Sequence, residues 1–211
     1  MRNCPTLVDY AYILVVFAVV LLSLTVHEAA HAWTADVLGD PTARLLGRVS
    51  LNPIVHIDLY GTIILPLVAA ISGLPIIGWA KPVPVNINRL RRHRRDFVLV
   101  AAAGPASNLV LALGAAVLVR AGGIAGPTST AFGLLEQIVY TNVMLAVFNM
   151  VPVPPLDGGN VLAGLLPREA AHLFEQLRPY GFLILYALMF TGILSAIILP
   201  PASFLERLLL Q

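Results

Sequence analysis

The sequence contains few charged residues and almost no cysteine. Lys, Arg, Asp and Glu make up 11% of its 211 residues, whereas about a quarter of the residues of a soluble domain are charged. Hydrophobic residues make up 58%, and the mean hydropathy is +0.86. This composition excludes an ordinary soluble protein and indicates a chain whose solvent is a lipid bilayer. The single cysteine, Cys4, excludes an internal disulfide.

Long apolar runs occupy most of the chain. A helix that crosses a bilayer needs about 20 mostly apolar residues. Because these runs leave no room for a separate soluble domain, the sequence predicts one integral membrane domain over residues 1–211. Its predicted fold class is an all-α polytopic membrane protein with five to six hydrophobic segments, ending in a short amphipathic tail, PPASFLERLLLQ. The segments that qualify as spans are 10–34, 97–120, 131–151 and 180–200.

A fifth apolar segment, 61–80, is interrupted by helix-breaking residues. It forms either a kinked span or a re-entrant segment, and hydropathy does not decide between the two. The stretch that follows, 81–88, is predicted to be a short membrane-associated β-strand or loop. The interruptions in the apolar segment are Pro66, Gly73, Pro75 and Gly78.

The basic residues are concentrated in RLRRHRRD (89–96), which holds five arginines in eight residues. An arginine cluster can mark nucleic-acid binding. Beside membrane segments it is more typical of a cytoplasmic loop that follows the positive-inside rule. The sequence therefore predicts the lipid bilayer, and no nucleic acid, as a partner.

A polar motif, HEAAH, lies toward the C-terminal end of the first apolar segment. A charged side chain deep in a bilayer costs from a few to more than about ten kcal/mol, so such residues persist mainly where they have partners or a task. His27 and His31 are one helical turn apart, and two imidazoles at this spacing can bind one zinc ion. Glu28 can lie close to the metal without ligating it and act as general base for a water molecule.

A catalytic zinc site needs a third protein ligand and an open position for water. Asp157 stands out because it lies in NMVPVPPLDGGN (149–160), whose prolines disfavour regular helix and can deliver a carboxylate on a stiff turn. Asp157 could instead cap the short helix that begins near Gly159, and spacing alone does not separate the two roles. The candidates for the third ligand are His56, Asp58, Glu136, Asp157 and His172.

Three motifs together resemble the site-2 protease family of intramembrane zinc metalloproteases. They are HEAAH in a membrane helix, GPASN (104–108) in another, and NMVPVPPLDGG, in the order found in that family. GWAKPVPVN (78–86) also resembles a segment found in many short bacterial members. The resemblance runs from about Leu24 to Asn160, and the sequence contains neither the PDZ nor the CBS domain of larger members.

The resemblance implies a set of site residues. His27, His31 and Asp157 are expected to bind one zinc ion per chain, and Glu28 is expected to be the catalytic glutamate. Asn149 matches an asparagine thought to hold substrate or the oxyanion. Asn108, with Gly104 and Pro105 of the GPxxN pattern, is expected to help there or to have a structural, supporting role.

The resemblance also implies an activity, the cleavage of transmembrane segments in regulated intramembrane proteolysis. The expected substrate is a single-span membrane protein, such as an anti-sigma factor or a remnant signal peptide. The catalytic core is expected over about 10–166, with C-terminal helical segments over 167–211. The alternative is a non-proteolytic membrane protein that binds or transports metal, although polar residues spread over several spans, or repeated halves, are not apparent.

The proposed ligands constrain the topology, because HEAAH and Asp157 must face the same side of the membrane. If 61–80 crossed the bilayer, three crossings would separate them and they would face opposite sides. The 61–88 region is therefore predicted to return to the side that it entered from. This return also places the arginines at 44, 48 and 89–95 on one side, as the positive-inside rule expects. The metal is then on the cytoplasmic side of the inner (plasma) membrane, with the N-terminus outside.

The segment of Lys81, Pro82, Val83, Pro84, Val85 and Asn86 has two alternative interpretations. A substrate helix must unwind locally before water can attack it, and an exposed strand edge near the metal would satisfy its freed backbone groups. The segment could form this edge, or it could be a plain proline-rich connection.

Overall fold

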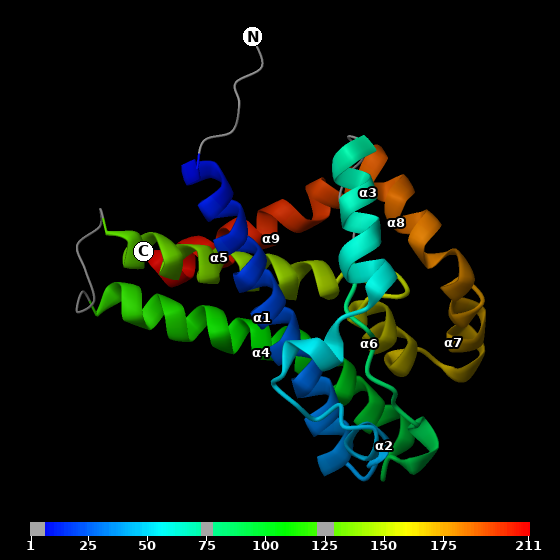
Figure 1. Cartoon of the computed structure of the whole chain (residues 1–211). Coiled ribbons are helices and arrows are strands. Elements are labelled where there is room, and N and C mark those ends of the chain that lie inside the picture. The colour runs from blue at the N-terminus through cyan, green and yellow to red at the C-terminus, as the bar shows by residue number, and fades with distance from the viewer. Residues whose placement is uncertain (1–6, 73–77, 122–128) are drawn as a thin grey trace.

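The computed structural model of the chain consists of helices and irregular connections (Figure 1). It describes residues 7–72, 78–121 and 129–211, and within these ranges there is no strand, so the all-α prediction is confirmed. The longer helices are α1 (Leu7–Val37), α3 (Leu65–Ser72), α4 (His93–Arg120), α5 (Thr130–Asn149), α6 (Asp157–Leu165), α7 (Arg168–Glu175), α8 (Gly181–Phe190) and α9 (Ile193–Leu210). The short helical turns are α2 (Thr42–Leu45), η1 (Pro53–His56), η2 (Leu59–Ile64), η3 (Ile87–Arg89) and η4 (Arg178–Tyr180).

Four helices, α1, α4, α5 and α9, are long and apolar enough to cross a membrane. The first three coincide with predicted spans. Large apolar side chains on α1 lie on the outside of the bundle, for example Leu14, which is 67% exposed, and Leu22, which is 56% exposed. Lipid tails, and not water, suit such a surface. The chain is therefore a multi-pass membrane protein.

The predicted span at 180–200 is wrong. The chain breaks between α8 and α9 at Gly192, whose φ of +75° lies in the left-handed region that glycine adopts without a Cβ clash. The spanning helix is α9, and it includes the residues predicted to form a short tail. Pro200 and Pro201 lie inside this helix. Ile198, two positions before Pro200, and Ala202, directly after Pro201, are buried against neighbouring helices, and this packing opposes the helix-breaking effect of the prolines.

The helices α4, α5 and α9 lie side by side, and α1 crosses them (Figure 1). Small side chains line the contact between the three, which lets the backbones approach closely, as is common between helices in membranes. The buried cluster consists of Ala112, Ala115 and Ala116 from α4, Val139 and Val143 from α5, and Ala202 from α9.

The segment that contains η2 and α3 follows η1 and comes back to its own starting point. The helical stretch of η2 and α3 runs for 14 residues, about 21 Å, which is shorter than the about 30 Å of a hydrocarbon core. The N–H of Trp79 donates to the carbonyl of Gly61 (3.2 Å), and the N–H of Lys81 donates to the carbonyl of His56 (2.8 Å). Because both ends of the segment lie side by side, the re-entrant form of the prediction agrees with the structure.

Part of that prediction cannot be compared. Residues 73–77, with Gly73 and Pro75, lie outside the described residues. The contacts between the two ends of the segment do not depend on them.

Of the two forms predicted for 81–88, the structure has the loop and not the strand. Pro82 and Pro84 lack the N–H groups that a ladder of strand hydrogen bonds requires. Buried charged side chains hold the loop at its two ends. The guanidinium of Arg48 donates to the carbonyl of Lys81, and the carboxylate of Asp40 accepts the N–H of Asn86 (2.6 Å).

Four crossings place both termini on one side of the membrane. We expect a maleimide that does not cross membranes to label the native Cys4, and a cysteine at position 211 in a Cys4→Ser chain, from the same side. A cysteine introduced at the exposed Asn88 is the control, and we expect it to be labelled from the other side. Labelling of positions 4 and 211 from opposite sides would contradict the re-entrant segment.

Candidate metal centre

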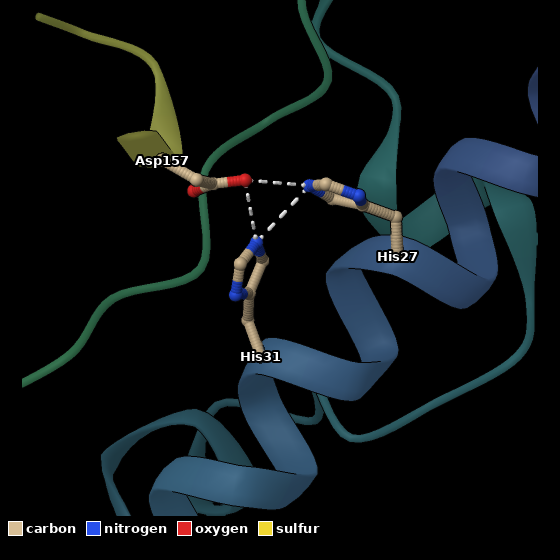
Figure 2. Close-up of side chains that lie close together, drawn as sticks. All are labelled: His27, His31 and Asp157. Carbon is tan, nitrogen blue, oxygen red and sulfur yellow. Dashed lines mark hydrogen bonds and ion pairs between the residues drawn. The ribbon is translucent and has the colours of Figure 1, made fainter. Parts of the chain in front are cut away.

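Two histidines of α1 and an aspartate of α6 meet inside the protein. His27 and His31 are only 3% and 8% exposed, and Figure 2 shows both rings directed toward Asp157. Asp157 Oδ2 lies 3.0 Å from His27 Nε2 and 3.3 Å from His31 Nε2, and the two Nε2 atoms are 3.1 Å apart. The structure thus brings together the three residues expected to be metal ligands.

The hydrogen-bond partner of Nδ1 determines which ring nitrogen carries the proton in each of the two imidazoles. His27 Nδ1 lies 2.6 Å from the Oδ1 of Asn108, and His31 Nδ1 lies 2.7 Å from the backbone carbonyl oxygen of Val100. Both oxygens can only accept, so each Nδ1 carries the proton and donates it. Each Nε2 then presents a lone pair toward Asp157.

This arrangement fits a metal ion. Asp157 Oδ2 is buried, and no hydrogen-bond donor to it is found among the described residues, so three electron-pair donors face one another with no proton between them. Donor atoms around a tetrahedral zinc with bonds of about 2.0–2.1 Å lie about 3.3 Å apart. The observed separations of 3.0, 3.1 and 3.3 Å are close to that value.

The turn before α6 explains how Asp157 reaches the histidines. Asp157 is the first residue of α6 and its side chain makes no capping hydrogen bond, so the alternative role as a helix cap does not describe it. Gly158 allows α6 to approach the end of α5, because a Cβ there would lie 2.3 Å from the carbonyl oxygen of Met150.

The GPxxN pattern on α4 supports the same centre in two ways. Gly104 leaves room for the rings, since a Cβ there would lie 2.3 Å from His31 Nε2 and 2.6 Å from His27 Nε2. Asn108, one turn further on, is completely buried, and its amide is occupied by His27 and by other protein groups. Asn108 therefore lies behind the His27 ring, and both the oxygen and the NH2 group of its amide have protein partners.

The other candidates lie apart from this cluster. His56 Nε2 hydrogen-bonds to the carbonyl of Ser50, and Asp58 caps η2 by accepting the N–H of Gly61 (2.7 Å). Glu136 and His172 do not belong to the metal-binding group found among the described residues.

Glu28 and Asn149, which are expected to act beside the metal, are close in sequence to residues of the cluster. Glu28 directly follows His27 on α1 and is half-buried. Asn149, at the end of α5, donates to the carbonyl of Leu145 one turn earlier (2.9 Å).

Sequence reasoning missed Asn142 and Ser23, which are buried behind Asn108. The signal that could have revealed them is their polarity within long apolar segments, where an amide needs a partner.

The fold and the site together define a polytopic helical membrane protein with a buried His–His–Asp cluster that could hold a metal ion. The family model described as Peptidase family M50 matches residues 15–126 and 123–192. The chain therefore belongs to peptidase family M50.

Two relatives illustrate the similarity. A protein of Bacillus subtilis (strain 168) named "Putative zinc metalloprotease YwhC" is 39% identical over 186 residues, which cover 85% of this chain and 82% of the relative. "Putative zinc metalloprotease Rip2" of Mycolicibacterium smegmatis is 32% identical over 177 residues, which cover 83% of this chain and 66% of the relative. No solved structure gives a significant match.

Gly104→Ala tests the metal centre from the helix that faces it. The new methyl group would occupy the space between the two Nε2 atoms, so we expect zinc affinity to fall by at least about 100-fold. Alanine is favoured over glycine in a helix by about 0.5–1 kcal/mol, so helix propensity does not oppose the change. Gly114→Ala, in the same helix with no atom within 4 Å of the added Cβ, is the matched control. Equal zinc affinity in both variants, measured by chelator competition, would contradict the site.

Proposed function

We propose that this chain is an intramembrane zinc metalloprotease that hydrolyses peptide bonds in the transmembrane segments of other membrane proteins. The observation that carries the proposal is the meeting of His27 Nε2, His31 Nε2 and Asp157 Oδ2, all as lone-pair donors, within a bundle of membrane-spanning helices. Membership of peptidase family M50 and the zinc metalloprotease names of the relatives support it.

Each residue has a distinct role in the proposed reaction. His27, His31 and Asp157 hold one zinc ion, which when bound polarises a carbonyl and lowers the pKa of a water molecule to about 7. Glu28 accepts a proton from the attacking water and passes it to the departing amine. Asn149, close to Asp157 in the chain, is proposed to bind the substrate or the oxyanion.

The substrate is proposed to be a single-span membrane protein of the anti-sigma factor or remnant signal peptide type. Such a helix must unwind before hydrolysis, and its freed backbone groups need partners. The loop of Lys81–Asn86 is a suitable place for it. Val85 packs beside Ala35 of α1 and Val100 of α4, next to the elements that hold His31, and the loop is fixed at both ends.

The proposed location is the inner (plasma) membrane, with the metal on the cytoplasmic side. The arginine-rich stretch at 89–96 leads into α4 and lies at the end of the bundle that carries Asp157. The positive-inside rule expects such a stretch on the cytoplasmic side. Arg94 ties this stretch to α6 by donating to the carbonyl of Ala163 (2.9 Å). The proposed catalytic core, about 10–166, contains every site residue. Residues 167–211 are proposed to belong to the same single domain, and the packing of α9 on α4 and α5 supports this.

Two substitutions separate metal binding from catalysis. We expect Glu28→Gln to keep its zinc and to lose cleavage of a single-span substrate by about 10²–10⁴-fold, because only the proton acceptor is removed. We expect Asp157→Ala to lose zinc as well as cleavage. Purified protein in detergent, assayed for bound zinc and for cleavage of a panel of substrates, provides both measurements. Cleavage that survives in Glu28→Gln would contradict the role of Glu28 as proton acceptor. Zinc binding without cleavage in the wild-type chain would favour the alternative, a membrane protein that only binds or transports metal.

Proline at position 83 tests the substrate loop. Val83→Pro removes an N–H group that the loop is proposed to offer to the substrate backbone, so we expect cleavage to be lost while bound zinc stays at the wild-type level. Val83→Ala keeps this N–H and is the matched control. Val85→Pro should have the same effect, although it also disturbs the packing of Val85. Unchanged cleavage in Val83→Pro would leave the loop as a plain connection.

A further inference from the structure

A second buried amide, Asn142 of α5, lies behind Asn108. Both side chains are 0% exposed. Asn108 Nδ2 donates to Asn142 Oδ1 (2.8 Å), and Asn142 Nδ2 donates to Ser23 Oγ of α1 (2.9 Å) and to the backbone carbonyl of Ile138 (2.9 Å). A continuous chain of hydrogen bonds therefore runs from the backbone of α5, through α4, to the imidazole of His27.

The direction of this chain is fixed at its far end. The backbone carbonyl of Ile138 can only accept, so Asn142 must turn its NH2 group toward it and its Oδ1 toward Asn108. Asn108 must then offer its NH2 group to Asn142, and its Oδ1 is left for His27. The backbone carbonyl of Ser23, 3.4 Å from Asn108 Nδ2, favours the same orientation of that amide.

We propose that Asn142 is a positioning residue for the metal centre, which acts through Asn108 to fix the tautomer and orientation of the His27 ring. The inference rests on the metal site proposed above and extends it to a residue two steps away from the ligand atoms. Partners of ligating histidines commonly set which ring nitrogen carries the proton.

A reversed Asn108 amide shows why the orientation matters. Its NH2 group would face His27 Nδ1, which would have to become an acceptor, and the ring proton would move to Nε2. That proton would point at Asp157 and at His31 Nε2, in the space that the metal needs. Because Asn108 and Asn142 are completely buried, bulk water does not reach the amide to hold it in place of Asn142.

The same contacts could in principle serve only to join the helices, since amides that hydrogen-bond across helices stabilise membrane bundles. The two roles differ in what they control. A residue that only joins helices changes the stability of the metal-free and zinc-loaded protein alike. A residue that sets the His27 tautomer changes the affinity for zinc.

The experiment measures the zinc dissociation constant of the full chain in detergent by competition with a chelator. We expect Asn142→Leu, which fills a similar volume without an acceptor, to bind zinc about tenfold more weakly than wild type. Asn142→Asp keeps an oxygen for Asn108 to donate to, and should bind zinc nearly as tightly as wild type. Thr141→Val is the matched control, because Thr141 is a buried neighbour whose hydroxyl bonds only Gln137 among the described residues.

A double-mutant cycle decides whether the effect passes through Asn108. In an Asn108→Ala background we expect Asn142→Leu to cause no further loss of zinc affinity. Wild-type affinity in Asn142→Leu, or a further tenfold loss in the Asn108→Ala background, would overturn the inference. If Asn142→Leu does not fold, Asn142→Ser, whose side chain is too short to reach Asn108, replaces it with the same expectations. Failure of the wild-type chain to bind zinc would instead contradict the proposed function itself.

Discussion

The interior of a bilayer offers no water to a polar group, and the whole structure depends on this constraint. Every polar side chain drawn into the helix bundle must find its partner in the protein. His27 finds Asn108 and His31 finds the carbonyl of Val100, whereas Asp157 Oδ2, which faces both Nε2 atoms, has no hydrogen-bond donor among the described residues. The surrounding polar groups are hydrogen-bonded to one another, whereas these three atoms face one another and form a potential binding site for a cation.

Helix packing and the metal centre are linked because the same residues serve both. The small residue Gly104 allows α4 to approach the histidines of α1, and Gly158 allows α6 to approach the end of α5. Three elements that are distant in the chain thus meet at one point, and before α4 the chain returns to the C-terminal end of α1, where the N–H of Arg91 donates to the carbonyl of Leu38. The loop at 81–86 is fixed to this framework by Arg48 and Asp40, close to the helix that carries His27 and His31.

Features with a local pattern could be predicted from the sequence. The spans of α1, α4 and α5 followed from apolar runs, and the shared face of His27 and His31 followed from their spacing of four. The position of Asp157 came from its motif and from topology. The break at Gly192 could not be predicted, because hydropathy does not report a left-handed residue within an apolar run. The partnership of Asn108 with Asn142 joins residues 34 positions apart, and only the packing of α4 on α5 creates it.

Zinc X-ray absorption on the purified protein tests the central claim, that two imidazoles and one carboxylate hold the ion. We expect a four-coordinate shell with nitrogen and oxygen atoms at about 2.0–2.2 Å and the outer-shell scattering typical of two imidazole rings. We expect no sulfur in the shell, since none of the three proposed ligands is a cysteine. A sulfur ligand, or a shell of oxygen atoms without imidazole scattering, would contradict it.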